Sequence, residues 1–349
     1  MTAAAPPVAA RHEWVDAAKG IAIILVVLYH AILFSGEAGI TSRWSTIAST
    51  LSTFRMPLFF FAAGLFAAKA LGSSLGQLVR RRVVRLLWIY VLWSAIWLAV
   101  TAFAPTAGSG PSGVAGLLLL PVRPDANTWF VYALAVYFVL AWLLRRLPVW
   151  LQLAPAVALT VLLETNALRS GDVTLDKMGM YFTFFLLAVH SGRRVMALAS
   201  RVRAWHAAAA ALTYVGLTGA ASVASLHYVP GVQLVLSAVA VITGVAVSVV
   251  LSRLRGARWL IALGSRTLPV YLLHFFPILL LTALLGPAAG SLAPVALLIP
   301  PALTVIGVVA SLLVHRLTRR VPGLYALPAW LRRRTEDVRL PARPEPSRL

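Results

Sequence analysis

Long apolar runs, bounded by charged residues or by Gly and Pro, repeat along the chain between residues 19 and 315. An α-helix needs about 20 such residues to cross a hydrocarbon layer about 30 Å thick. The pattern therefore predicts an all-α, polytopic membrane helix bundle with about ten transmembrane helices. The predicted spans are 19–35, 56–71, 84–103, 128–144, 148–164, 178–191, 204–226, 231–252, 267–285 and 293–315.

Three stretches outside these spans have other patterns. Residues 44–54 are amphipathic, which is typical of a helix lying along the outer interface. Residues 113–120 are too short to span and indicate a re-entrant or interfacial segment. The tail is basic and rich in Pro and Arg, and we expect its end to be disordered. The predicted organisation is a cytoplasmic segment 1–18, a membrane domain 19–315 and a cytoplasmic tail 316–349.

Composition agrees with this class of protein. Hydrophobic residues make up 60% of the chain and charged residues only 12%, so a soluble domain could not cover its apolar surface. The chain contains no cysteine, which excludes a cysteine nucleophile, a thiolate zinc site and a disulfide framework.

The net charge is +21, and the positive residues are distributed as expected for a membrane protein. With the N-terminus inside, 25 of the 31 Lys and Arg residues lie on cytoplasmic segments and Arg266 lies beside the ninth span. This asymmetry predicts that both termini are cytoplasmic, as the positive-inside rule requires. We therefore expect a multi-pass protein of the inner cell membrane, surrounded by the lipid bilayer, with no nucleic-acid partner. The outer loops hold the other five positive residues: Arg43, Arg55, Arg123, Arg169 and Lys177.

Lys19 and His30 lie on one face of the first predicted span. They are eleven residues apart, which returns a helix to within about 20° of its starting direction and raises it by about 16 Å. With Lys19 at a membrane surface, His30 lies near the middle of the bilayer. An ionisable side chain at that depth points to a functional site. The alternative is a core histidine that is hydrogen-bonded to a neighbouring helix.

Arginines cluster at residues 80–85, at the cytoplasmic start of the third span. Arg82 and Arg85 are three apart and share a helical face, with Arg80 and Arg81 beside them. Guanidinium groups next to a helix N-terminus suit a phosphate-bearing ligand. The alternative is a topology anchor that contacts lipid headgroups.

A third group of polar residues opens the ninth span. Thr267 is the predicted N-cap, with Pro269 in the first turn. Tyr271 and His274 follow on one face, and the helix rise places His274 about 10 Å into the membrane. His30 and His274 would then lie at similar depths and could face one cavity. No histidines and carboxylates have ligand spacing on one element, so no metal is predicted.

Together these residues resemble the acyltransferase 3 family of membrane O-acyltransferases, which modify cell-surface glycans. The family's basic residue, ten intervening residues and histidine match Lys19 and His30, and its paired arginines match Arg82 and Arg85. Residues 54–64 are similar to the family's second-span signature. The segment Asn127-Thr-Trp129-Phe is similar to its fourth-span entry, and Tyr271-Leu-Leu-His274 to its late tyrosine–histidine element.

The chain departs from this pattern at two positions. Arg55 and Ala63 stand where relatives of the fucose O-acetylase-like branch often have histidine and serine. No extracytoplasmic hydrolase-like domain follows the last span, so the chain resembles the stand-alone form. An acceptor-side partner would then be a separate extracytoplasmic protein.

The resemblance implies transfer of an acyl group from acyl-CoA, with acetyl-CoA as co-substrate and no bound cofactor, to a hydroxyl of a saccharide or glycolipid acceptor. The CoA phosphates would lie near Arg82, Arg85 and Arg81. Lys19 would hold CoA or orient the first span. His30 would be the general base or, as a second choice, carry an acyl-histidine intermediate. The thioester would be positioned, or its oxyanion stabilised, by His274 and Tyr271.

Two other classes of function fit parts of the sequence. A proton-coupled transporter or flippase of a glycan precursor would use His30 as a relay group, but it leaves the arginines before the third span unexplained. A scaffold of a glycan-assembly complex would carry no chemistry. Consumption of acetyl-CoA distinguishes the acyltransferase from both.

Overall fold

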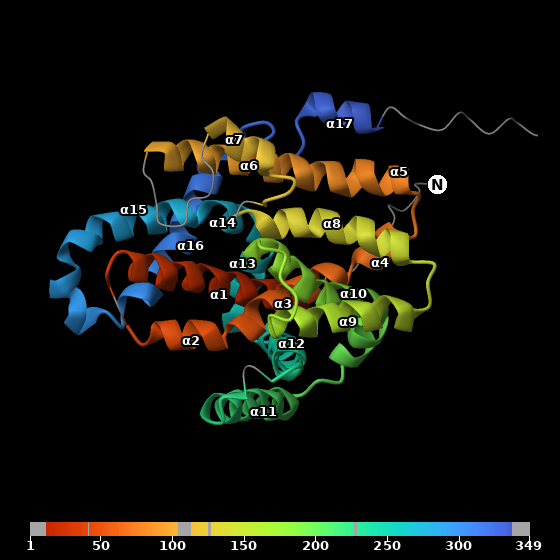
Figure 1. The fold of residues 1–349 in the computed structure, drawn as a ribbon, viewed down its shortest axis with the longest axis horizontal. Helices are drawn as coiled ribbons and strands as arrows, with labels where there is room; N and C mark the ends of the chain where they lie inside the picture. The colour runs from red at the N-terminus through yellow and green to blue at the C-terminus, as the bar shows by residue number, and fades with distance from the viewer. Residues whose placement is uncertain (1–11, 41, 104–112, 125–126, 227–228, 337–349) are drawn as a thin grey trace, which may run out of the picture.

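The computed structural model describes residues 12–40, 42–103, 113–124, 127–226 and 229–336 (Figure 1). Within these ranges the regular structure is helical and no strand occurs, which confirms the predicted all-α class. The α-helices are α1 (Glu13–Glu37), α2 (Trp44–Thr50), α3 (Ser52–Gly64), α4 (Ala67–Leu71), α5 (Leu75–Leu78), α6 (Val84–Phe103), α7 (Gly113–Leu119), α8 (Trp129–Leu144), α9 (Val149–Glu164), α10 (Val173–Ala199), α11 (Ala204–Val223), α12 (Val232–Ser252), α13 (Arg258–Gly264), α14 (Thr267–Leu273), α15 (Phe275–Leu285), α16 (Ile299–Thr318) and α17 (Ala329–Glu336). The π-helical segment η1 covers Val79–Val83, and the 3-10 segments η3 and η4 cover Arg255–Ala257 and Gly286–Val295.

Each of the ten predicted spans falls on helix. Five helical segments are long and apolar enough to cross a membrane, and α8 and α9 are shorter apolar helices. The number of ten spans therefore stays a prediction. The five segments are Glu13–Glu37, Leu75–Ala102, Val232–Ser252, Thr267–Val295 and Ile299–Thr318.

Apolar side chains cover the outside of the bundle. Leu212, Val223 and Leu317 are 74%, 90% and 81% exposed. Exposed leucine and valine on this scale would destabilise a protein surrounded by water, and they are the surface that lipid requires.

Several predicted boundaries are wrong. The range 56–71 divides into α3 and α4, and the range 178–191 belongs to the 27-residue helix α10. In α10 the helix includes the polar residues on both sides of the predicted apolar run. Asp172 caps its start by accepting from Thr174 N–H and Leu175 N–H (2.8 and 3.0 Å).

Two positive residues assigned to outer loops lie within helices. Arg55 is in α3 and is buried, and Lys177 is in α10 and is half-buried. The tail also differs from the expectation of disorder, because residues 329–336 form α17. Its last residues, 337–349, lie outside the described part of the chain.

Helix α1 runs through the middle of the bundle, with α6 and α17 on one side and α11 on the other (Figure 1). It packs against α3, α12, α13 and α16. The contact with α13 is made by backbone, because a Cβ atom on Gly264 would overlap the Asp16 carbonyl oxygen. Small residues allow such close helix approach in membranes. This contact brings the start of α14 beside Lys19.

Two irregularities shape the helices that carry the predicted site. Pro277 has no N–H to donate to the Leu273 carbonyl, and the helix is interrupted between α14 and α15 at His274. Helices α5 and α6 are joined by the π-helical turn η1, which contains Arg80, Arg81 and Arg82. Single π-helical turns inside α-helices frequently mark functional sites.

Candidate active site

The two predicted histidines are in direct contact. His30 comes from α1, and His274 lies at the break between α14 and α15. His274 Nε2 is 3.1 Å from His30 Nδ1, and the ring centroids are 5.0 Å apart. His274 is 0% exposed, whereas His30 is partly exposed. His30 is therefore the more accessible of the two imidazoles.

The hydrogen bonds of this pair define which nitrogen atoms carry protons. His30 Nδ1 is 2.8 Å from the Val26 carbonyl oxygen, and His274 Nδ1 is 2.9 Å from that of Val270. A carbonyl oxygen only accepts, so both Nδ1 atoms are donors. The single His30 Nδ1–H is then shared between the Val26 carbonyl oxygen and the lone pair of His274 Nε2. His30 Nε2 has a lone pair and no hydrogen bond within the described residues, which leaves it available as a base.

Aromatic rings hold the His30 imidazole in place. Phe275 packs edge-on against it at 4.5 Å between centroids, with Tyr29 at 5.0 Å and Phe34 at 6.5 Å. Trp97 supports Phe275 from behind at 5.6 Å. These apolar walls restrict water around the imidazole and strengthen electrostatic interactions there.

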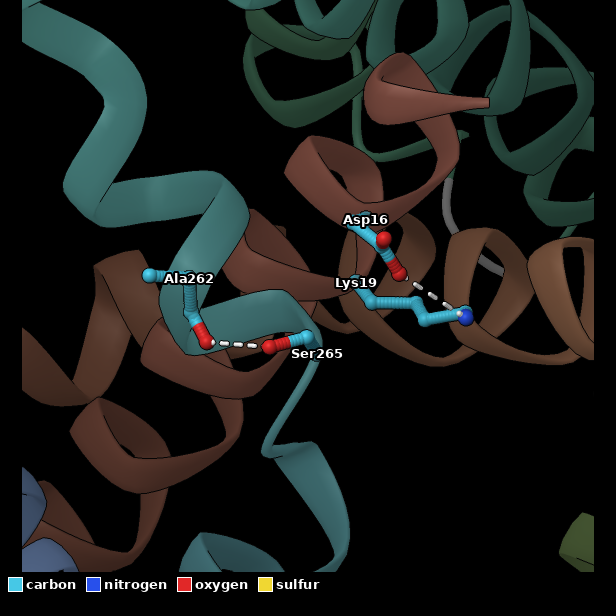
Figure 2. Close-up of polar contacts among 4 residues, drawn as sticks. All are labelled: Asp16, Lys19, Ala262 and Ser265. Atoms are coloured by element: carbon cyan, nitrogen blue, oxygen red, sulfur yellow. Dashed lines mark hydrogen bonds and ion pairs between the residues drawn. The ribbon is translucent and has the colours of Figure 1, made fainter. Parts of the chain in front are cut away.

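Lys19 forms an ion pair with Asp16, its neighbour one turn earlier on α1 (Figure 2). Lys19 Nζ lies 3.3 Å from Asp16 Oδ1, and the Lys19 side chain is 30% exposed. At the nearby end of α13, Ser265 Oγ donates to the Ala262 carbonyl at 2.7 Å. The sequence analysis missed Asp16 as a partner of Lys19, although their spacing of three residues was the available signal.

A cavity of about 230 Å³ links Lys19 with Tyr271. Tyr271 Oη accepts a hydrogen bond from Phe130 N–H (3.2 Å) in the first turn of α8. The Tyr271 ring lies 6.3 Å from that of His274, so Tyr271 stands between the cavity and the histidine pair. The cavity is lined by Lys19, Phe59, Ala63, Leu86, Phe130, Val131, Leu134, Thr267, Leu268 and Tyr271.

One detail of α14 differs from the prediction. Thr267 is the first helical residue, and Arg266 occupies the N-cap position without a side-chain hydrogen bond. Thr267 instead lines the cavity next to Lys19. Its side chain is thus part of the candidate site.

The predicted phosphate-binding arginines precede a cavity-lining residue, Leu86, in the sequence. Arg81, Arg82 and Arg85 are exposed, the first two on η1 and the third at the start of α6. Arg85 immediately precedes Leu86, which lines the cavity. None of these three arginines is among the residues that line the cavity.

A second basic cavity, of about 280 Å³, was not predicted. It is formed where the chain folds back after α16, and Arg319, Arg320 and Arg332 line it. The indole N–H groups of Trp88 and Trp93 hold this segment against α6 by donating to backbone carbonyls (2.7 and 2.8 Å). Helix α17 also contacts η1. All residues that line this cavity lie between 319 and 332.

Comparison with known proteins identifies the class. The chain belongs to the acyltransferase 3 family, since the family's sequence profile, described as an acyltransferase domain, matches residues 12–316. A particular relative is the inner membrane protein YcfT of Escherichia coli (strain K12), which is 26% identical over 181 residues. The match covers 43% of this chain and 47% of YcfT, so it spans about half the length of the relative. No solved structure matches the chain.

Proposed function

We propose that this protein is an integral membrane O-acyltransferase that moves an acyl group, acetyl above all, from cytoplasmic acyl-CoA to a hydroxyl of a cell-envelope saccharide or related glycoconjugate. The observation that carries the proposal is the hydrogen-bonded pair of His30 and His274, which leaves His30 Nε2 free. Family membership supports membrane acyltransferase activity, and the geometry supplies a base in a position to act.

The reaction needs one proton carrier. An acceptor hydroxyl donates to His30 Nε2, and its oxygen attacks the thioester carbonyl carbon while Nε2 takes the proton. The tetrahedral intermediate collapses, the C–S bond breaks, and the proton passes from Nε2 to the CoA sulfur. Throughout, His30 Nδ1–H donates to His274 Nε2 (3.1 Å), which supports the transient imidazolium.

This geometry assigns different roles to the two histidines. His30 touches the reacting atoms. Both nitrogens of His274 are already hydrogen-bonded, one to Val270 and one to His30, so His274 is a positioning residue.

The donor site extends from the histidine pair to the arginine-rich end of the bundle. The cavity beside Lys19 and Tyr271 accommodates the thioester arm. The CoA phosphates bind Arg81, Arg82 and Arg85, and the basic cavity of the tail extends this surface. The proposal places this end in the cytoplasm, with ten spans across the inner membrane. The acceptor then arrives from the opposite side, presented by a separate partner protein or directly from the membrane.

The proposed function is tested with membrane vesicles that contain the wild-type chain, supplied with radiolabelled acetyl-CoA and envelope saccharide extract. We expect label to enter the saccharide fraction, and vesicles without the protein are the control. Release of CoA distinguishes this activity from transport, because a transporter or flippase would not consume acetyl-CoA. Absence of both label transfer and CoA release would contradict the proposal.

The arginines beside the cavity are expected to act on donor binding. Replacing Arg82 and Arg85 together by alanine removes two charge-assisted contacts to phosphate, so the KM for acetyl-CoA should rise on the order of 10–100-fold. The kcat should change little, because neither side chain reaches the histidine pair. Arg145→Ala and Arg146→Ala, at the start of the loop after α8, are the matched control. An unchanged KM would contradict the proposed docking of CoA.

A further inference from the structure

Arg55 is a buried arginine next to the catalytic helix. It lies on α3, is 9% exposed, and its guanidinium carbon is 3.8 Å from the centroid of the Tyr29 ring. One N–H donates to the Ala48 carbonyl at 3.2 Å. The other guanidinium N–H groups have no acceptor in the part of the chain that the structure describes. Since Tyr29 directly precedes His30 on α1, this positive group lies close to the base.

Lys177 contributes a second positive charge. It is half-buried on α10, one turn before Tyr181, and the two side chains therefore share a helical face. Helices α3 and α10, which carry Arg55 and Lys177, pack directly against each other, and both positive charges act on His30. Arg55 and Lys177 thus form one positive pair, beside His30 and at the opposite end of α1 from Lys19.

Within the described ranges no carboxylate forms an ion pair with Arg55 or Lys177, and the Lys19–Asp16 pair lies far along α1. Glu164 lines a separate cavity of about 100 Å³ together with Tyr181. Buried charges without a counter-ion are costly in a membrane protein and are usually balanced by a partner or ligand. Within the described ranges the pair has no counter-ion, so it offers a site that an anion can occupy.

We propose that Arg55 and Lys177 bind an anionic group of the acceptor, a carboxylate or a phosphate, and so present a neighbouring hydroxyl to His30 Nε2. The acceptor is then an acidic saccharide. The guanidinium fork of Arg55 matches both anions, and its contact with Tyr29 fixes the plane of the fork. The site itself is argued from the burial of Arg55 and its contacts with Tyr29 and Ala48, and only its role as the acceptor site rests on the proposed function.

The test measures ligand binding with the purified full-length protein in lipid nanodiscs. The probes are methyl glucuronoside, glucose 1-phosphate and neutral methyl glucoside, at constant ionic strength, with the thermal unfolding midpoint as the readout. We expect the anionic probes to raise the midpoint of the wild type at concentrations where the glucoside does not. Arg55→Gln and Lys177→Gln should each weaken anion binding on the order of 10–100-fold. Arg123→Gln, which removes an exposed positive charge from a loop, should bind as the wild type does.

Each outcome bears on the site. Equal effects of glucoside and anions, or unchanged binding in both variants, would overturn the proposal. Lys177→Gln provides the test if Arg55→Gln fails to fold. The stronger of the two anionic probes identifies the group as a carboxylate or a phosphate. Anion binding through Arg55 without acetyl transfer from acetyl-CoA would refute the proposed function and keep the site. Acetyl transfer without a preference for anions would refute the anion site and keep the proposed function.

Discussion

Replacing His30 by alanine is expected to lower acyl transfer on the order of 10²–10⁴-fold, the usual contribution of a general base. The variant removes the one imidazole nitrogen in the histidine pair that is free to take a proton from the acceptor hydroxyl. The KM for acetyl-CoA should change little, because the proposed phosphate site lies at the arginine-rich end of the bundle and not at His30. Initial rates of CoA release, measured at equal protein levels, provide the readout.

The matched control for this variant is His190→Ala. His190 is also a partly exposed histidine of a long helix, but its Nε2 is hydrogen-bonded to Gln152 Oε1 (3.0 Å) and it lies outside the site. This variant should keep wild-type activity. If His30→Ala retained transfer while the control behaved as expected, His30 would not be the base.

The second large effect is expected at His274. In His274→Phe the ring shape is kept, but the acceptor for His30 Nδ1–H is lost, leaving only the Val26 carbonyl. Loss of such an orienting partner typically costs 10–100-fold in activity, so kcat should fall on the order of 10–100-fold while KM stays close to that of the wild type.

If His274 positions His30, a substitution that keeps a hydrogen-bond acceptor should restore activity, which a purely structural role does not predict. His274→Gln offers an amide oxygen that can accept from His30 Nδ1–H, so it should restore part of the lost kcat. The unfolding midpoints of both variants show whether they fold equally well. Equal loss of kcat in His274→Gln and His274→Phe, with both variants folded, would contradict the assignment.

Hydropathy and helix periodicity were sufficient to predict the all-α class and to select candidate residues for the site. Lys19 and His30 were found because eleven residues bring a helix back to the same face, and His274 because of its depth. Burial in a hydrocarbon layer constrains each helix separately, which is why a single sequence carries this information.

The contacts between helices could not be predicted, because they depend on how the helices lie beside one another. The bond between His30 and His274 joins residues 244 positions apart, and no pattern within either helix specifies it. Arg55 was assigned to a loop because a charge ends an apolar run, whereas the Tyr29 ring stabilises that charge inside the bundle. The basic cavity of the tail likewise exists only because Trp88 and Trp93 bind the returning chain.

The distance along the chain between the two histidines also has a consequence for biosynthesis. A chain that enters the membrane from its N-terminus inserts His30 with the first helix, long before residue 274 leaves the ribosome. Until then His30 Nδ1–H has only the carbonyl of its own helix as an acceptor. The contact between the two histidines is thus completed only by one of the last helices to be made, so an unfinished chain in the membrane lacks the paired imidazoles.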